Sequence, residues 1–401
     1  MEDGTFSHVD RAALARDLDA LRAEAEASLG PDDLTHLLRM ERWGRTCTAV
    51  GYATAWIAPN PFSMIALSTG SAVRWAIVAH HVLHKGYDKV PGTPARLTST
   101  GFAAGSRRWI DWNDWMLPDA WRLEHNVLHH YHTGEVLDPD LVEENVQTIR
   151  APGRSAWVRY GVIAFYALTW KLTYYAPNTY QILRRSERLR AAGAPAVPKQ
   201  IALGPESYLE AFDPRTADGR RFLRECVLPY ALSRFAAIPA LFAPLGPVAV
   251  ANVAINSLGA ELLSNLHSFL IIAPNHAGED LYRFEGSPKG RGDFYLRQIV
   301  GSVDYRTGGD VRDFLQGFLN YQIEHHLWPD LPARAYQRLQ PRVREVCAKH
   351  GVPYVQEGLG ARVRKLVRIM AGTASMRRMS PPATDAADCQ PASASRTLAS
   401  R

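Results

Sequence analysis

The chain has 401 residues, a formal net charge of +6 and a mean hydropathy of -0.20, so it could form one large domain or two smaller ones. Its four cysteines form no CxxC pair, which excludes a disulfide scaffold, a zinc ribbon and an iron–sulfur site. Arginine carries most of the basic excess and binds phosphate and carboxylate groups well. We therefore expect lipid head groups or an acidic protein as partners; no motif supports nucleic acid.

The first 45 residues are polar and charged, and we expect them to form cytosolic amphipathic helices. From residue 10 to residue 28, Leu14, Leu18 and Leu21 fall on one side of a helix, which Gly30 and Pro31 end. A second short helix is expected over 32–45. No pattern of a cleaved signal peptide precedes these helices.

The next segment has no charged side chain over the 28 positions between Arg45 and Arg74, and Pro59-Asn60-Pro61 divides it. A helix needs about 20 apolar residues to cross a membrane. We predict a membrane hairpin with short spans at about 46–58 and 62–79, which could borrow length from their flanks. A buried helical hairpin in a soluble core is the alternative.

A second long apolar block covers 227–273 and carries only two charged residues, Arg234 and Glu261. Prolines at 244 and 247 divide it into predicted spans at about 227–243 and 248–273. Residues 157–175 mix aromatic side chains with Arg159 and Lys171, which favours a helix lying at the membrane surface.

Two further segments have a biased composition. Residues 184–224 are strongly basic and interrupted by proline, which is typical of a cytosolic segment. Residues 372–401 are rich in Ser, Ala, Pro and Thr, and we expect a disordered tail there.

Histidines gather in three distant segments that lie beyond the ends of the predicted spans. His80 and His84 are four residues apart, as are His125 and His129, so each pair shares a helix face, whereas His81 points elsewhere. Neutral imidazole is a common ligand of iron, copper and zinc. Eight imidazoles are too many for one tetrahedral zinc and suit two metals. The candidate ligands are His80, His84, His125, His129, His130, His276, His325 and His326.

Polar residues beside these histidines could bind the second ring nitrogen of a ligand and so select its tautomer. A solvated acid beside a helix is the plainer interpretation of each of them. Aligned carboxylate pairs are absent, which argues against a ferritin-like di-iron bundle. The candidate supporting residues are Glu124, Asn265, Glu279, Asp280, Gln322 and Glu324.

One shared metal site requires all the histidine clusters to lie on one side of the membrane. Two hairpins meet this requirement if residues 157–175 do not cross. Arg and Lys crowd the segments on the histidine side, which the positive-inside rule assigns to the cytosol. We therefore predict an all-α membrane protein: four transmembrane helices in two hairpins, with a cytosolic helical cap that holds the histidine-rich site.

In its motifs the chain resembles the membrane-bound fatty acid desaturase family over roughly residues 45–345. The three histidine boxes are His80–x3–His84, His125–x3–His129-His130 and Gln322–x2–His325-His326, and His276 matches a further histidine outside them. The resemblance implies that residues 46–350 form a membrane desaturase domain with two non-haem irons. It also implies that O₂ and two electrons convert a CH₂–CH₂ pair of a fatty acyl lipid or acyl thioester into a cis alkene and two waters.

The resemblance leaves two features open. The third box begins with Gln322 instead of histidine, as in the front-end and acyl-lipid branches of the family, so a ligand role for Gln322 is in doubt. The cytochrome b5 motif His-Pro-Gly-Gly is absent, which implies a separate electron donor such as a ferredoxin, docking on the Arg-rich face. The Arg-rich composition favours a bacterial inner membrane, with the active site facing the cytosol.

Two rival functions are weighed against desaturation. A di-iron fatty acid or alkane hydroxylase of the same superfamily would share every motif. A histidine-rich metal transporter or haem protein would place its ligands at mid-span, but only His267 lies well inside an apolar span.

Overall fold

The computed structural model describes residues 6–195 and 210–379. The described chain is mostly helical, with short π-helical stretches (η1, η4 to η7) and 3₁₀ turns (the other η elements). Up to residue 132 the elements are α1 Arg11–Ala27, α2 Pro31–Ala55, α3 Pro61–Ala72, η1 Val73–Ala79, α4 His80–Leu83, η2 Ala95–Leu97, η3 Gly105–Arg107, α5 Arg108–Asp111, α6 Pro118–Trp121, η4 Arg122–His129 and α7 His130–His132.

The middle and C-terminal elements follow in the same way. Up to residue 275 they are α8 Val142–Asn145, α9 Gln147–Arg150, α10 Ala156–Trp170, η5 Lys171–Tyr175, α11 Ala176–Ala191, α13 Ala217–Phe222, η6 Leu223–Val227, α14 Leu228–Leu232, η7 Ser233–Ala237, α15 Ile238–Ala240, η8 Ala243–Leu245, α16 Pro247–Ile272 and η9 Ala273–Asn275. The remainder are β1 Tyr282–Phe284, α17 Arg291–Val300, β2 Asp304–Tyr305, α18 Asp310–Leu315, η10 Leu319–Tyr321, α19 Gln322–Leu327, α20 Ala333–Lys349, β3 Gln356–Glu357, α21 Leu359–Ala371 and β4 Arg377–Met379.

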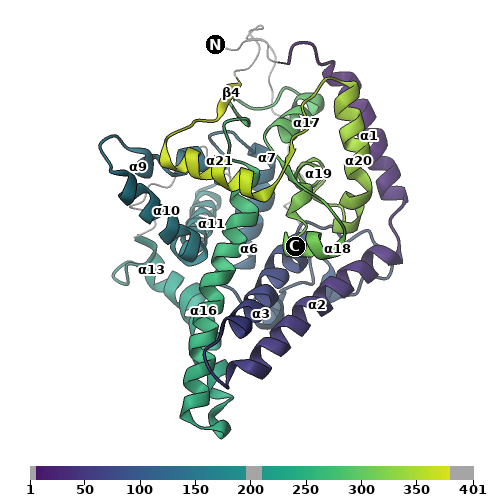
Figure 1. The fold of residues 1–401 in the computed structure, drawn as a ribbon. Helices are drawn as coiled ribbons and strands as arrows, with labels where there is room; N and C mark the ends of the chain where they lie inside the picture. Colours follow the sequence, from purple (N-terminus) through teal and green to yellow (C-terminus); the bar gives the residue numbers. More distant parts are fainter. Residues whose placement is uncertain (1–5, 196–209, 380–401) are drawn as a thin grey trace.

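The helices α2, α3 and α16 run together to one end of the molecule, the lower end in Figure 1. Glycines allow their backbones to approach closely. A Cβ atom added at Gly70 would lie 2.0 Å from Thr48 Oγ1, and one at Gly259 would lie 2.5 Å from Met64 Sδ. Helix α4, which continues α3 through η1, and the segment after η9, which continues α16, carry His80, His84 and His276 to the candidate site.

Two helical stretches in the described chain are long and apolar enough to cross a membrane: Pro61–Leu83, which joins α3, η1 and α4, and Pro247–Asn275, which joins α16 and η9. The four predicted transmembrane helices are therefore not all supported. The first half of α2 carries charged residues, and the helical stretch from α13 to α15 carries Arg220, Arg221, Arg224 and Arg234, so neither is uniformly apolar.

Large apolar side chains are exposed on the hairpin end that lies away from the histidines. They belong to the turns after α2 and before α16 and to the helices α3 and α16 that follow these turns, and an exposed patch of this kind is typical of a lipid- or protein-binding surface. The members are Ile57, Phe62, Ile65, Leu241, Leu245, Val248 and Leu258.

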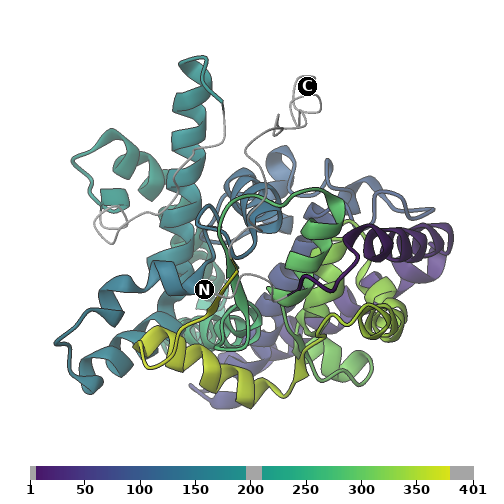
Figure 2. The same cartoon turned by 90° about the horizontal axis from the view of Figure 1, so that it is seen from above.

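The opposite end is a helical cap in which α1 packs against α17 and α20 (Figures 1 and 2). Helix α1 has almost the predicted limits and buries Leu14, Leu18 and Leu21. The separate helix expected over 32–45 is not present as such. It continues into the first apolar stretch as α2, because no proline follows Pro31 before Pro59 and the glycines at 44 and 51 remain helical.

Other boundaries also differ from expectation. The helix predicted over 157–175 continues without a break through η5 and α11 to Ala191, so the basic segment begins helical; residues 196–209 of that segment lie outside the described residues.

The fold is not purely α-helical. Strand β1 pairs in parallel with β4, and β2 with β3. Strand β4 thereby orders part of the segment expected as a disordered tail from residue 372, and residues 380–401 of that tail lie outside the described residues.

Candidate metal centre

A first group of four histidines comes from three elements that are far apart in sequence. His80 and His84 lie at the end of the helix through α4, His125 lies on η4 and His325 lies on α19, and one ring nitrogen from each falls within 4.8 Å of the others. His80 Nε2 and His325 Nε2 are 2.9 Å apart. All four side chains are buried. Nitrogens this close, from four separate rings, suit ligands of one metal ion.

A second group lies beside the first and consists of His129, His276 and His326, whose ring nitrogens also fall within 4.8 Å of one another. His276 comes from the segment after η9, so the end of α16 reaches the site. His125 and His129 form a further group with Asp140. The structure thus brings all three histidine-rich segments and His276 to one place.

His130 and His81 hold distinct positions. The ring of His130 lies between the groups, with its centroid 4.5 Å from that of His84 and 4.3 Å from that of His326, although it belongs to neither group of converging nitrogens. Both of its ring nitrogens are buried and without a partner among the described residues. His81 turns away and its Nδ1 donates to the Ile77 carbonyl.

The π-helical winding of η4 explains how its histidines point inward together. The His130 N–H bonds to the His125 carbonyl, five residues earlier, instead of the residue four positions before. In this wider turn His130 lies near the same helix face as His125, whereas in an α-helix the two residues would lie on different faces. The same winding occurs in η1, where the His80 N–H bonds to the Trp75 carbonyl.

Hydrogen bonds to the second ring nitrogen orient several of these rings. His129 Nδ1 donates to Asp138 Oδ1 at 2.8 Å, and His276 Nδ1 donates to the Gly301 carbonyl at 3.2 Å. His326 Nδ1 donates to Gln298 Oε1 at 2.9 Å. Each bond selects the tautomer whose Nε2 carries the lone pair that can bind a metal, which is the usual arrangement of histidine ligands, and in His276 this Nε2 lies 2.9 Å from Gln322 Nε2.

Buried ring nitrogens without partners test whether the site fits metal ions. Within the described residues, His84 Nε2, His326 Nε2 and both nitrogens of His125 make no hydrogen bond. A buried polar atom left unpaired costs free energy, and groups of such atoms converging on one point are accounted for by an ion that they share. The donor set, nitrogen from imidazole, suits iron, copper or zinc.

Burial also favours the neutral, metal-binding form of the rings. It holds the pKa of His125, His130 and His326 well below the ordinary value, and it lowers the pKa of His276 to about 3. His129 differs: burial alone would lower its pKa, but the adjacent Asp138 carboxylate raises it above the ordinary value.

The supporting residues expected from sequence are mostly engaged elsewhere. Glu279 pairs with Arg368, Asp280 pairs with Arg362 and Lys365, and Asn265 holds the Lys171 backbone N–H. These three residues lie near a histidine in sequence or on the same helix face, but their side chains bond to other groups and not to a histidine ring.

The two glutamates that adjoin ligand candidates are buried but also bond to other groups. Glu124 accepts a hydrogen bond from Tyr175, and Glu324 accepts one from Tyr354. Gln322 alone of the six contacts a candidate ring, with Nε2 2.9 Å from His276 Nε2 while its Oε1 accepts from Asn275.

The residues that do orient the rings were not foreseen. Asp138 follows the second box by several residues in a loop, Gln298 lies on α17, and Tyr336, whose hydroxyl lies 3.3 Å from His325 Nδ1, lies on α20. No periodicity links these positions to the boxes, so only the folded chain identifies them.

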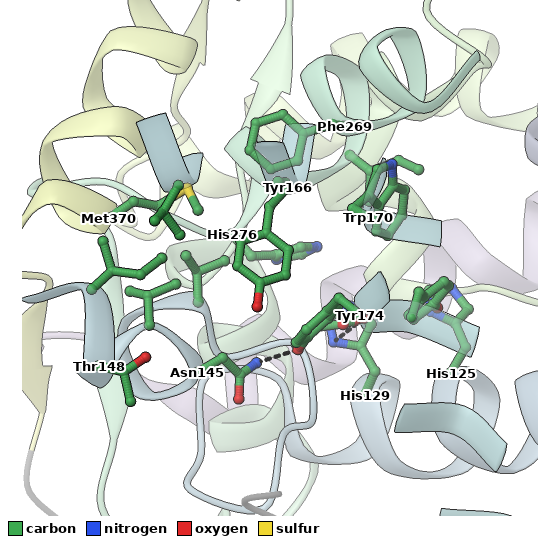
Figure 3. A pocket seen from close by; sticks show the side chains of 18 of the residues that line it. His125, His129, Asn145, Thr148, Tyr166, Trp170, Tyr174, Phe269, His276 and Met370 are labelled. Carbon is green, nitrogen blue, oxygen red and sulfur yellow. Dashed lines mark hydrogen bonds and ion pairs between the residues drawn. The ribbon is translucent and has the colours of Figure 1, made fainter. Parts of the chain in front are cut away.

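A cavity of about 200 Å³ opens beside the two groups and runs between α9, α10 and α16 (Figure 3). His125, His129 and His276 lie at its wall, and Tyr166, Trp170, Phe269 and Met370 contribute aromatic and apolar surface. Asn145 donates to the Tyr174 hydroxyl at 2.6 Å across one side. The cavity could therefore hold an apolar chain against the histidines, and Arg154 and Arg159 also line it.

Comparison with known proteins agrees with this site. The family model described as fatty acid desaturase matches residues 54–358. The chain is 26% identical, over 91% of its length and 81% of the other protein, to the NADPH-dependent stearoyl-CoA 9-desaturase of Mycobacterium tuberculosis. Shorter matches include the acyl-lipid (9-3)-desaturase of Physcomitrium patens, 32% identical over 27% of this chain and 20% of that one. Another is the delta(8)-fatty-acid desaturase 1 of Arabidopsis thaliana, 38% identical over 20% of this chain and 17% of that one.

Proposed function

The chain belongs to the fatty acid desaturase family and is an acyl desaturase, and from this premise we propose that its clustered histidines hold two non-haem irons. Two irons held here would supply the oxidation in which O₂, two electrons from a donor and two protons turn a CH₂–CH₂ pair into an alkene and two waters. The proposed ligands are His80, His84, His125, His129, His130, His276, His325 and His326.

This proposal rests on the two groups of converging histidine nitrogens and on the hydrogen bonds that orient three of these rings. Nδ1 donates to a carboxylate in His129, to a backbone carbonyl in His276 and to a side-chain amide in His326. The other ring nitrogen, Nε2, is therefore the one proposed to bind a metal in each ring. Gln322 Nε2 lies 2.9 Å from His276 Nε2, the nitrogen proposed as a ligand, so we propose that Gln322 gives up this contact when a metal binds; a ligand role for Gln322 itself is also a proposal. We assign Asp138, Gln298 and Tyr336 the positioning role first expected of the flanking acids.

We propose a long-chain fatty acyl thioester or acyl lipid as the substrate. The acyl chain would lie in the cavity beside His125 and His129, where the aromatic lining excludes water from the reacting carbons. Stearoyl-CoA, which the mycobacterial relative is named for, is the first substrate to test. Arg154 or Arg159 would then meet an anionic carrier group.

We further propose that the protein is a multi-pass protein of a bacterial inner membrane, with residues 46–350 as the catalytic unit and the histidines on the cytosolic side. The exposed apolar side chains at the hairpin ends, such as Phe62 and Leu245, support embedding in a bilayer. Electrons would come from a separate donor, such as a ferredoxin, on the cytosolic face.

The decisive experiment expresses the chain and its His325→Ala variant in a bacterial host and compares the host lipids by mass spectrometry. Acyl chains lighter by two hydrogens, absent with the variant, are the expected result. Chains heavier by one oxygen would instead establish a hydroxylase, and unchanged lipids with every acyl donor supplied would contradict both.

Iron content gives an independent readout with a matched control. His129→Ala should lose metal, whereas His132→Ala, three residues along the same segment and bonded to Glu135, should retain it. His81→Ala, His8→Ala and His350→Ala should also retain it. Purified protein carrying one haem or only copper would contradict the proposal.

A further inference from the structure

A second cavity of about 130 Å³ lies apart from the histidines, among α2, η1, the loop before α6 and the π-helical stretch η7. None of the proposed metal ligands lines it. Its lining combines polar and charged residues with aromatic ones. The residues are Thr48, Tyr52, Ser71, Arg74, Trp75, Ala79, Asp111, Trp112, Asn113, Asp114, Tyr230, Arg234 and Ile238.

Two guanidinium groups face this cavity without a carboxylate partner. Arg234 is 4% exposed; it donates to the Tyr52 hydroxyl at 2.6 Å, and its Nε is buried with no acceptor among the described residues. Arg74, on η1, makes no hydrogen bond or ion pair within the part of the chain that the structure describes. Guanidinium groups stay charged in proteins, so two such groups in a mostly apolar region call for an anion.

The acids at or beside the cavity have partners through at least one oxygen, although Asp114 Oδ1 is buried with no hydrogen bond among the described residues. Asp114 pairs with Lys171, and Asp111 pairs with Arg107 at 2.8 Å. Glu261 accepts from Trp115 Nε1 at 2.7 Å and from the Tyr230 hydroxyl at 2.6 Å. The protein therefore supplies positive charge to this cavity in excess of the negative charge that could balance it.

The geometry points to a binding site for the oxyanion head group of a membrane amphiphile, either the phosphate of a phospholipid or the carboxylate of a free fatty acid. A guanidinium group binds both through paired N–H donors. The cavity holds several water-sized groups but not a whole lipid, so only the head group would enter it. The cavity adjoins the candidate span Pro61–Leu83, where an acyl tail could lie along the helices.

This site is separate from the substrate cavity, but the two share a wall. Trp75 lines both cavities, and Ala79 of the second cavity immediately precedes His80. A bound head group would therefore neutralise the charge of Arg74, six residues before His80, without contacting the rings of the first histidine box.

The test measures binding to the purified full-length protein in detergent, by native mass spectrometry, with three probes: phosphatidylglycerol, oleate and inorganic phosphate. We expect one of the two amphiphiles to bind, and Arg74→Gln and Arg234→Gln each to weaken that binding by about tenfold or more, since each removes a charged donor. Arg224→Gln is the matched control, because Arg224 lies on the same helical stretch with its side chain 76% exposed, and it should bind as the unaltered protein does.

Folding of each variant is checked by iron content and thermal unfolding, neither of which depends on turnover. Arg74→Gln serves if Arg234→Gln fails to fold, because Arg74 holds no hydrogen bond that the fold would lose. Binding of inorganic phosphate as tight as that of either amphiphile would overturn the lipid assignment. Equal binding by Arg74→Gln, Arg224→Gln and the unaltered protein, or no binding of any probe, would overturn the site itself.

Discussion

At the scale of one residue, Asp138 orients the ring of His129, a candidate metal ligand. Its Oδ1 accepts from His129 Nδ1 at 2.8 Å and from the Asp140 N–H, and its Oδ2 accepts from the Gly134 N–H at 2.8 Å. Backbone donors thus hold the carboxylate in place while it holds the ring. A carboxylate behind a histidine fixes the tautomer and makes Nε2 a better ligand.

Replacing this carboxylate should therefore weaken metal binding without removing a ligand. We expect Asp138→Asn to lower iron affinity by about 10–100-fold, the usual effect of losing such a partner. Competition with a chelator measures it. Asp119→Asn, whose side chain is 78% exposed, is the control and should behave as the unaltered protein. Equal iron retention by both variants would mean that Asp138 only shapes its loop.

At the scale of elements, helix α21 is attached to the segment that carries His276 by an ion pair between a fully buried arginine and a partly buried aspartate. Arg362 is fully buried and donates to both carboxylate oxygens of Asp280, at 2.8 and 2.7 Å, and to the Ala277 carbonyl. Lys365 adds a further bond to Asp280. Removing one partner of a buried pair leaves an uncompensated charge, which is more costly than the pair itself is stabilising.

The pair predicts a pH-dependent contribution to stability. Burial alone would raise the pKa of Asp280, but its bonds to Arg362 and Lys365 lower it. A lowered folded-state pKa contributes stability that is present above the unfolded-state pKa, about 4, and lost as the pH falls through the folded-state pKa.

We therefore expect Asp280→Asn to reduce the free energy of unfolding by about 1–3 kcal/mol at neutral pH, less than for an isolated pair because Glu357 also contacts Arg362. The difference from the unaltered protein should vanish in acid. Thermal unfolding in detergent across pH measures both. Glu279→Gln, which breaks only the exposed pair with Arg368, is the control. A difference that does not shrink as the pH falls below about 4 would contradict the assignment to this carboxylate.

At the scale of the whole molecule, both hairpins present their turns at the end opposite the histidines. If the histidines face the cytosol, the turns must face the outside. In a chain whose four native cysteines are replaced by serine, we expect Ile57→Cys and Leu245→Cys to react with a membrane-impermeant thiol reagent in intact cells. Ser287→Cys, exposed on the histidine side, should react only after lysis. Labelling of Ser287→Cys in intact cells would reverse the orientation.

The local pattern by itself determined what depends on neighbours in sequence. The limits of α1 follow from its leucine spacing, the turn at Pro59-Asn60-Pro61 from its prolines, and the ligand candidates from the grouping of histidines at helical intervals. The boxes also determined the family, because their order and spacing carry the chemistry. These features are written in residues a few positions apart, and local propensity and side-chain periodicity are enough to read them.

Tertiary structure alone decided which groups meet across the chain. Asp138, Gln298 and Tyr336 support the rings while Glu279 and Asp280 turn to basic residues on α21, because partner choice depends on distance in space. The π-helical winding of η4 follows from packing, which can stabilise a turn that intrinsic propensity disfavours. The continuous helix from 156 to 191 and the pairing of β4 with β1 likewise rest on contacts with distant elements.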